Sequence, residues 1–251
     1  MRSLAEICSC LDVRFRPAET PDYPNALNGL QLENEGSVTR LAAAVDASER
    51  TIDQAVANGV DFLLVHHGLF WSGLRPLNGP LYRKIKKAMD GNLAIYSLHL
   101  PLDHFTEFGN SRLLAEETGL TDIEPFAEWK GLFLGASGGW DGDLNSLSQA
   151  VSSAVDGPVQ TVAGGPNLPG SVAVVSGGSG DDLELYYRKG ARTLIVGEGA
   201  HWTVPLAEEL GMNMIYAGHY RTETFGVRVL GQELARQFSL PFQFIDHPTG
   251  R

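Results

Sequence analysis

An internal repeat constrains the fold of this 251-residue chain more than any other feature. Three pairs of segments align in the same order, namely residues 43–46 with 173–176, 60–71 with 191–202, and 94–99 with 214–219. Buried strands share Leu, Ile and Val through composition alone, so one such match would carry little weight. The ordered series of matches indicates duplication and predicts two pseudo-symmetric lobes.

Within each lobe, short apolar runs alternate with helical patterns. Strands are expected at residues 41–45, 61–65, 93–98, 172–175, 193–196 and 214–216, and helices at 3–15, 48–58, 80–90, 203–210 and 222–238. The Gly-rich regions 135–145 and 163–180 are expected to be dense in turns. This alternation predicts an α/β fold in which residues 1–251 form one unit of two interlocked lobes, approximately 1–125 and 126–251, with a site between them.

Charge and cysteine content narrow the class of protein. The chain has 30 acidic and 19 basic residues and a formal net charge of -11, which disfavours nucleic acid as a partner. Cys8 and Cys10 are one residue apart on a predicted helix, where a local disulfide would be strained. The acidic Glu6 comes before any apolar run could form near the start of the chain, which disfavours a signal peptide. No apolar run reaches the ~20 residues of a membrane span. We expect a soluble, cytoplasmic protein without membrane contact.

Two consecutive histidines, His66 and His67, follow the apolar strand 61–65. A lone histidine at a strand end is more often a hydrogen-bonded structural residue than a ligand. Adjacent side chains of a strand point to opposite faces, so this pair converges on one site only if the strand breaks, and Gly68 offers such a break. Ligands collect at the carboxyl ends of strands in open α/β sheets, which favours a functional pair.

The last strand of each repeat ends in a histidine that precedes a carboxylate by four residues. His99 is followed by Asp103, and its repeat mate His219 is followed by Glu223. A helix beginning at the strand end would place each pair one turn apart. Imidazole with carboxylate suits Zn, Mn, Fe or Ni, and a glutamate can bridge two metals. Helix capping is the alternative explanation for each carboxylate, but it does not explain the repeated pairing with histidine.

Two divalent ions at such a site would leave it positively charged despite the acidic surface. Asp103 and Glu223 would cancel only part of the charge of the ions, so a small anion would be attracted. Two ions about 3.5–4 Å apart acidify bound water and stabilise attacking and leaving oxygens. The pattern therefore favours hydrolysis.

Several motifs together resemble the Nif-three-like family, whose members bear the label GTP cyclohydrolase 1 type 2 homologue. These motifs span the chain and are Asn28-Gly29-Leu30-Gln31, His66-His67-Gly68, His99-Leu100-Pro101-Leu102-Asp103, Gly197-Glu198 with His201, and Gly218-His219 with Thr222-Glu223. The resemblance implies a dinuclear metal centre and a toroidal homohexamer. It implies as metal ligands His66, His67, Asp103, His219 and Glu223, with Glu223 bridging. Many members have Thr where this chain has Leu100, which is not an implied ligand.

Three hypotheses for function follow. The first is a hydrolase that uses two divalent ions per chain on a small anionic or nucleotide-like substrate, with His99 or Glu198 handling protons. The second is a metal-binding or metal-delivery protein without catalysis, and the third is an interaction scaffold. The implied ligand set fits the first two hypotheses equally. Trp71 and Trp202 match in the repeat and are expected to pack rather than to stack on a ligand.

Overall fold

A computed structural model describes residues 1–73, 75–104 and 106–250 of the chain. These residues form two compact units. Unit 1 consists of Met1–Leu102 and Val227–His247, whereas unit 2 consists of Asp103–Gly226 and the chain from Pro248 onward. The expected lobes, 1–125 and 126–251, were contiguous halves. The observed units are discontinuous because the chain returns to unit 1 after Gly226.

The sheet of unit 1 contains four parallel strands and one antiparallel edge strand. Its order is β13 (Phe242–Phe244), β4 (Leu41–Asp46), β5 (Phe62–His67), β6 (Ala94–Ser97) and β2 (Gly29–Leu32). All neighbours are parallel except β2, which runs antiparallel to β6. A separate small pair joins β1 (Arg2–Ser3) to β3 (Ser37–Val38). The carboxyl ends of β4, β5 and β6 therefore lie at the same edge of the sheet.

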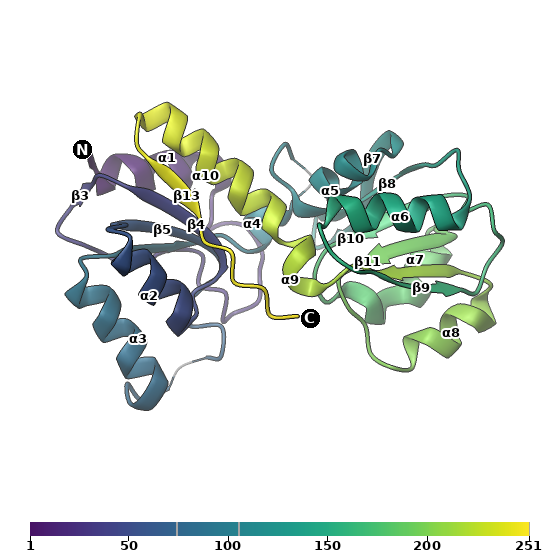
Figure 1. The fold of residues 1–251 in the computed structure, drawn as a ribbon, viewed down its shortest axis with the longest axis horizontal. Coiled ribbons are helices and arrows are strands. Elements are labelled where there is room, and N and C mark those ends of the chain that lie inside the picture. The colour runs from purple at the N-terminus through teal and green to yellow at the C-terminus, as the bar shows by residue number, and fades with distance from the viewer. Residues whose placement is uncertain (74, 105, 251) are drawn as a thin grey trace. The chain divides into compact units, whose positions relative to one another are not determined.

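Helices cover both faces of this sheet (Figure 1). They are α1 (Leu4–Phe15), α2 (Glu49–Ala57), α3 (Gly79–Asp90), the short α4 (Leu100–Asp103), and α10 (Thr224–Phe238), which enters unit 1 at Val227. Leu63, Val65 and Ile95 pack with Ile52 of α2 and Ala88 of α3. Because both faces are covered, the strands are apolar almost throughout, as the sequence predicts for a buried sheet.

The sheet of unit 2 has the order β7 (Thr121–Trp129), β8 (Leu132–Gly139), β10 (Val172–Val175), β11 (Thr193–Val196), β12 (Asn213–Tyr216) and β9 (Gln160–Ala163). Strands β10, β11 and β12 are parallel, and the flanking strands β8 and β9 are antiparallel to their neighbours. The hairpin of β7 and β8 extends the sheet on one side. Three parallel strands thus form the centre of each sheet.

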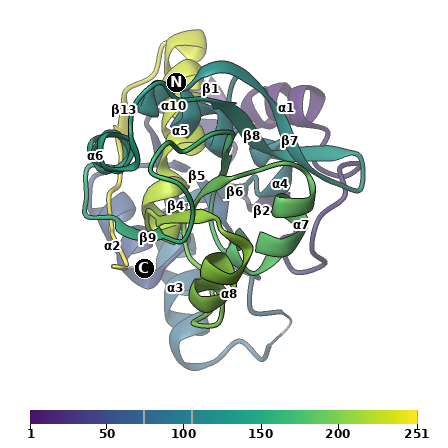
Figure 2. The same ribbon diagram turned by 90° about the vertical axis from the view of Figure 1, so that its right-hand side faces the viewer.

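Helices also cover both faces of the second sheet (Figure 2). They are α5 (Asn110–Thr118), α6 (Leu144–Ala154), α7 (Leu183–Arg188) preceded by the 3-10 turn η1 (Ser179–Asp182), α8 (Thr203–Leu210) and α9 (His219–Thr222). Leu114 of α5 and Leu147 of α6 pack on Val174 and Ile195. Tyr186 of α7 belongs to the cluster on the opposite face. Among the described residues, no helix is long and apolar enough to span a membrane.

The element order confirms the repeat as well as the α/β class. The series β4-α2-β5-α3-β6-α4 in the first half matches β10-α7-β11-α8-β12-α9 in the second. The next helix in each series then crosses to the other unit, since α5 belongs to unit 2 and most of α10 to unit 1. The chain therefore passes from unit 1 to unit 2 and then back to unit 1.

The expected turn-dense region 135–145 is wrong in its first part, because residues 135–139 belong to β8. Glycine at position 135 reflects close packing rather than a turn. A Cβ there would lie 2.9 Å from the carbonyl oxygen of Val174 on the neighbouring strand β10. Sequence patterns weigh glycine as a turn signal, and they do not register that two backbones need to approach.

Candidate metal centre

Unit 1 brings three histidines together at the carboxyl edge of its sheet. His66 and His67 end β5, and His99 follows β6 by two residues. The ring centroid of His66 lies 4.9 Å from that of His67 and 4.8 Å from that of His99. One ligand atom from each ring lies within 4.8 Å of the others, so the three can hold a metal ion. Strand β5 runs through His67, so the two rings converge without the expected break at Gly68.

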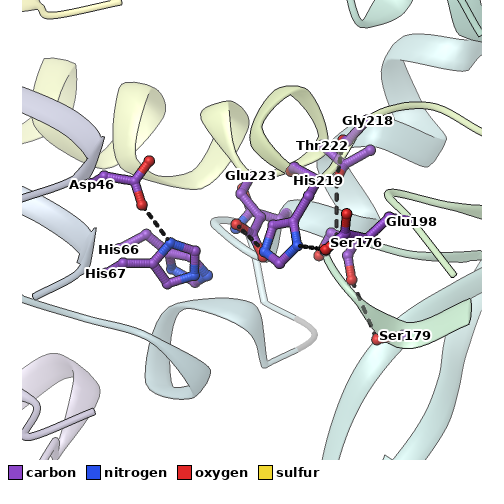
Figure 3. A network of polar contacts seen from close by, with 12 residues as sticks. Asp46, His66, His67, Ser176, Ser179, Glu198, Gly218, His219, Thr222 and Glu223 are labelled. Atoms are coloured by element: carbon purple, nitrogen blue, oxygen red, sulfur yellow. Dashed lines mark hydrogen bonds and ion pairs between the residues drawn. The ribbon is translucent and has the colours of Figure 1, made fainter. Parts of the chain in front are cut away.

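Each of these histidines is oriented by an acceptor at Nδ1. His66 Nδ1 lies 3.0 Å from the carbonyl oxygen of Leu98, and His67 Nδ1 lies 2.9 Å from Asp46 Oδ1 (Figure 3). His99 Nδ1 lies 2.8 Å from Asp22 Oδ1. A donated Nδ1–H fixes the tautomer that presents the Nε2 lone pair, which is the usual arrangement behind a metal-ligating imidazole.

A loop before β2 holds His99 in place. Asn28 Oδ1 accepts the backbone N–H of His99 at 2.7 Å, and Asn28 Nδ2 donates to Asp22 Oδ2 at 2.7 Å. The backbone N–H of Leu100 also donates to Asp22 Oδ2, at 3.0 Å. Burial raises the pKa of Asp22, but hydrogen bonds from His99 and Asn28 and the charge of His99 outweigh burial and lower it. Asp22 is therefore an ionised, fully bonded support for His99.

Trp71 lies against this cluster. Its ring centroid is 5.1 Å from that of His67 and 4.6 Å from that of His99. Trp71 is 39% exposed and packs on these two histidines, and its repeat mate Trp202 is 48% exposed. The Trp71 ring contacts two of the three candidate ligands and restricts their orientation.

In unit 2, His219 lies between two carboxylates (Figure 3). His219 opens α9, and Glu223 follows the last residue of this short helix, so the helical turn expected after the strand is present. His219 Nε2 lies 3.1 Å from Glu223 Oε2, and His219 Nδ1 lies 2.9 Å from Glu198 Oε1. Glu223 is 4% exposed. A buried carboxylate beside an Nε2 atom is a suitable pair of metal ligands.

The two carboxylates control the protonation of His219. Burial lowers its pKa, but the hydrogen bonds and negative charges of Glu223 and Glu198 outweigh burial and raise the pKa to about 9 in the metal-free chain. A metal ion needs the neutral ring, so it has to displace this proton. Without a metal, the two carboxylates therefore favour the protonated ring of His219.

Asp103 belongs to unit 2 and is 7% exposed. Its Oδ1 accepts a hydrogen bond from Asn110 Nδ2 at 2.7 Å, and Asn110 Oδ1 accepts the backbone N–H of Gly226 at 2.8 Å. Asn110 therefore ties the carboxylate to the start of α10. A carboxylate can accept this bond and still ligate a cation through its remaining lone pairs.

The loop after β10 is shaped around Glu223. Gly177 has a positive φ of +68°, and a Cβ at this position would lie 2.3 Å from Glu223 Oε1. Thr222 Oγ1 accepts the backbone N–H of Gly177 at 3.0 Å and so fixes the approach. The Gly-rich stretch 177–180 does form a turn, but sequence reasoning missed its contact with the candidate ligand.

The donor set fits a divalent transition metal. The candidate ligands are imidazole nitrogens and carboxylate oxygens, and each histidine has its second nitrogen bound to a protein acceptor. Cys8 and Cys10 lie on α1 and take no part. A nitrogen and oxygen donor set suits Zn, Mn, Fe or Ni and does not distinguish among them.

The chain is similar to known proteins over nearly its whole length. Residues 3–250 match the family described as Duf34/NIF3, NGG1p interacting factor 3. A protein of Deinococcus radiodurans named GTP cyclohydrolase 1 type 2 homolog is 38% identical over 91% of this chain and 88% of its own length. Proteins of the same name from Pyrococcus horikoshii and Escherichia coli K12 are 38% and 32% identical and cover 98% and 97% of this chain, each with 98% of its own length.

Solved structures extend the similarity to the fold. A crystal structure of a protein from Thermus thermophilus matches with a TM-score of 0.89 and 36% identity over 100% of both chains. The structure of reduced HcgD from Methanocaldococcus jannaschii matches with a TM-score of 0.85 and 26% identity over 98% of both chains. The whole chain, with both of its units, corresponds to these proteins in length and fold.

Proposed function

The chain belongs to the Duf34/NIF3 family, and from this premise we propose that it is a metal-dependent hydrolase with two divalent ions per chain. The proposed ligands come from both units. They are His66, His67, Asp103, His219 and Glu223, with Glu223 bridging the ions. The substrate class is a small anionic or nucleotide-like molecule, for which the GTP cyclohydrolase label of the relatives is an additional argument.

One observation supports this proposal above the others. Every candidate histidine has a protein acceptor on Nδ1, and three of these acceptors are carboxylates, namely Asp46, Asp22 and Glu198. Structural histidines do not need this repeated arrangement. Metal-ligating histidines do, because the acceptor orients the ring and strengthens the Nε2 donor.

When bound, a pair of divalent ions would supply acidified water and would stabilise the oxygens of the scissile group. The side chains of this chain do the remaining work. Asp103 and Glu223 provide two negative charges, fewer than two divalent ions require for neutrality, so an anionic substrate is attracted. The 4% exposure of Glu223 removes competing bulk water from the bridging position.

His99 is the proposed general acid–base group. Its Nδ1 donates to the ionised Asp22, so its Nε2 is presented to accept or release a proton. Glu198 is proposed as a second proton-handling residue, beside its contact with His219 Nδ1. His99 also belongs to the histidine cluster that can hold a metal, so its loss has to be followed by metal analysis as well as by rate.

We also propose that six chains form a closed toroid. Homo-oligomers of this kind combine three-fold and two-fold axes. Light scattering of the purified protein at micromolar concentration should give about six times the chain mass of 27.1 kDa. A stable monomer under these conditions would rule out the toroid.

The deciding experiment loads the protein with Zn, Mn, Fe or Ni and screens nucleotides, phosphoesters and cyclic amides, with a metal-stripped control. We expect hydrolysis that depends on the metal. His67→Ala should lower the metal content, whereas His201→Ala, which changes an exposed histidine, should leave two ions bound. If ions exchange readily with chelators and no substrate in the screen is hydrolysed, metal delivery replaces hydrolysis as the function. If neither His67→Ala nor His201→Ala changes the metal content, and protein partners bind with or without metal, the scaffold hypothesis replaces both hydrolysis and metal delivery.

A further inference from the structure

A pocket of about 510 Å³ lies within unit 2, beside the candidate metal ligands. Glu198 follows β11, Tyr216 ends β12, and Gln160 begins the neighbouring strand β9, so the pocket opens at the ends of these strands. Glu198 both lines the pocket and contacts His219 Nδ1 at 2.9 Å. A molecule in the pocket would therefore lie next to the proposed reaction centre. Its volume suits a ligand of nucleoside size.

Part of the pocket wall is apolar. Val159, Val204 and the ring of Tyr216 line it. The hydroxyl of Tyr216 is bonded to Thr203 Oγ1 at 2.6 Å, so the ring rather than the hydroxyl is available to a ligand. Apolar and aromatic walls favour a ligand with flat apolar faces.

The polar groups of the pocket select the edge of such a ligand. Gln160, Glu198 and His201 line it, and none of its described lining residues is lysine or arginine. The pocket therefore does not neutralise a phosphate, and the Glu198 carboxylate repels one. A carboxylate accepts several N–H donors, and a carboxamide both donates and accepts. A wholly apolar ligand would leave Glu198 desolvated without compensation.

We infer that this pocket binds the neutral nitrogen heterocycle of the substrate, a planar ring with N–H donors beside a carbonyl group. The ring lies between the valines and Tyr216, and its N–H and carbonyl groups bond to Glu198 and Gln160. This inference rests on the proposed function in one respect, since only that function makes the ligand a substrate. Two regions then recognise two parts of the substrate. The pocket binds the uncharged ring, and the metal ligands face the anionic part of the substrate.

Calorimetry with guanosine, a neutral nucleoside with N–H donors beside a carbonyl, tests the inference. The full-length protein as isolated and the chelator-treated protein should both bind guanosine. The chelator-treated protein should bind ribose 5-phosphate at least 10-fold more weakly than the protein as isolated. Val204→Trp fills the pocket and should weaken guanosine binding at least 10-fold. Val13→Trp, the same change at a position 78% exposed on α1, should not.

Gln160→Leu is a second variant, chosen because Gln160 is exposed at the start of β9 and so contributes little to the core. It should also weaken guanosine binding. Absence of guanosine binding in the wild type, or equal binding by Val204→Trp and Gln160→Leu, would overturn the pocket assignment. Guanosine binding without any metal-dependent hydrolysis would instead retain the pocket and reject the proposed function. The two failures are therefore distinguishable.

Discussion

The two units have the same order of strands and helices but place different chemistry at equivalent strand ends. After the middle parallel strand, unit 1 has His67 where unit 2 has Glu198. In unit 1 the histidine is supported by Asp46, from the strand beside it. In unit 2 the glutamate is itself the support, because it accepts from His219 Nδ1. The duplicated scaffold provides equivalent positions, and single residues decide which position ligates and which supports.

The difference also divides charge between the units. Unit 1 contributes imidazoles, two of which (His67 and His99) have a carboxylate at Nδ1, whereas unit 2 contributes Asp103 and Glu223 together with His219 as ligand candidates. Nitrogen donors favour transition metals over Mg or Ca, and carboxylates can bridge and neutralise two ions. Each unit alone offers part of such a donor set. The proposal therefore predicts that changes in either unit affect both ions.

The largest effect is expected from Glu223→Gln, which keeps the size of the bridging side chain and removes its charge. Turnover should be abolished and at least one ion lost. The fold should persist, because Val227, Leu230 and Leu234 anchor α10 in the core. Metal analysis and circular dichroism check both outcomes. Glu233→Gln, the same change at a half-buried position of α10 that pairs with Arg14, is the matched control. Full turnover with two ions bound in Glu223→Gln would contradict a bridging role.

His99→Ala should lower turnover by roughly 10²–10⁴-fold, the range typical of losing a general acid–base group, while both ions remain. The pH–rate profile should lose the limb that reports this group. His104→Ala, five residues further on, should retain most of the activity. Loss of an ion from His99→Ala would show that His99 is a ligand, and the proton-handling assignment would then be wrong.

The supporting carboxylates should matter less than the ligands themselves. Asp46→Asn in unit 1 and Glu198→Gln in unit 2 should each weaken metal affinity by about 10–100-fold. Competition with a chelator of known affinity measures this loss. Asp53→Asn, an exposed change on α2, serves as the control. If only one of the variants Asp46→Asn and Glu198→Gln lowered metal affinity, metal binding would depend on a single unit. That result would contradict a contribution from both units.

The smallest expected effect is on how the stability of the metal-free protein depends on pH. The pKa of His219 rises from 6.5 to about 9 on folding, so its protonated form stabilises the fold. This contribution is full below pH 6.5 and is lost as pH rises through about 9. Denaturant unfolding with chelator present should show the loss in wild type and not in His219→Gln. The lowered pKa of Asp22 in unit 1 acts in the opposite sense, since its contribution is lost as pH falls below 3.8.

Periodicity and the repeat were sufficient to predict the α/β class, the central strands and the strand-end histidines, because burial on both faces imposes long apolar runs. The spacing of His219 and Glu223 also predicted their contact, since a helical turn follows the strand. Asp46 also has a signal in the sequence. It is a polar residue at the carboxyl end of an apolar strand.

Other features left no sequence signal of this kind. Asp22 lies in a loop without periodicity, and its role depends on Asn28 and on a chain reversal that brings it to His99. Gly177 resembles any turn glycine, although its lack of a side chain makes room for Glu223. The division into units was equally hidden, because the exchange of α5 and α10 is a matter of tertiary packing rather than of local propensity.

The most direct test of the central claim is anomalous diffraction from crystals of the metal-loaded protein. The account predicts two ion peaks per chain, about 3.5–4 Å apart. The Nε2 atoms of His66, His67 and His219 and the carboxylate oxygens of Asp103 and Glu223 should all lie within bonding distance of these peaks. A single ion held by the histidines of unit 1 alone, or two distant ions each confined to one unit, would contradict a shared dinuclear centre.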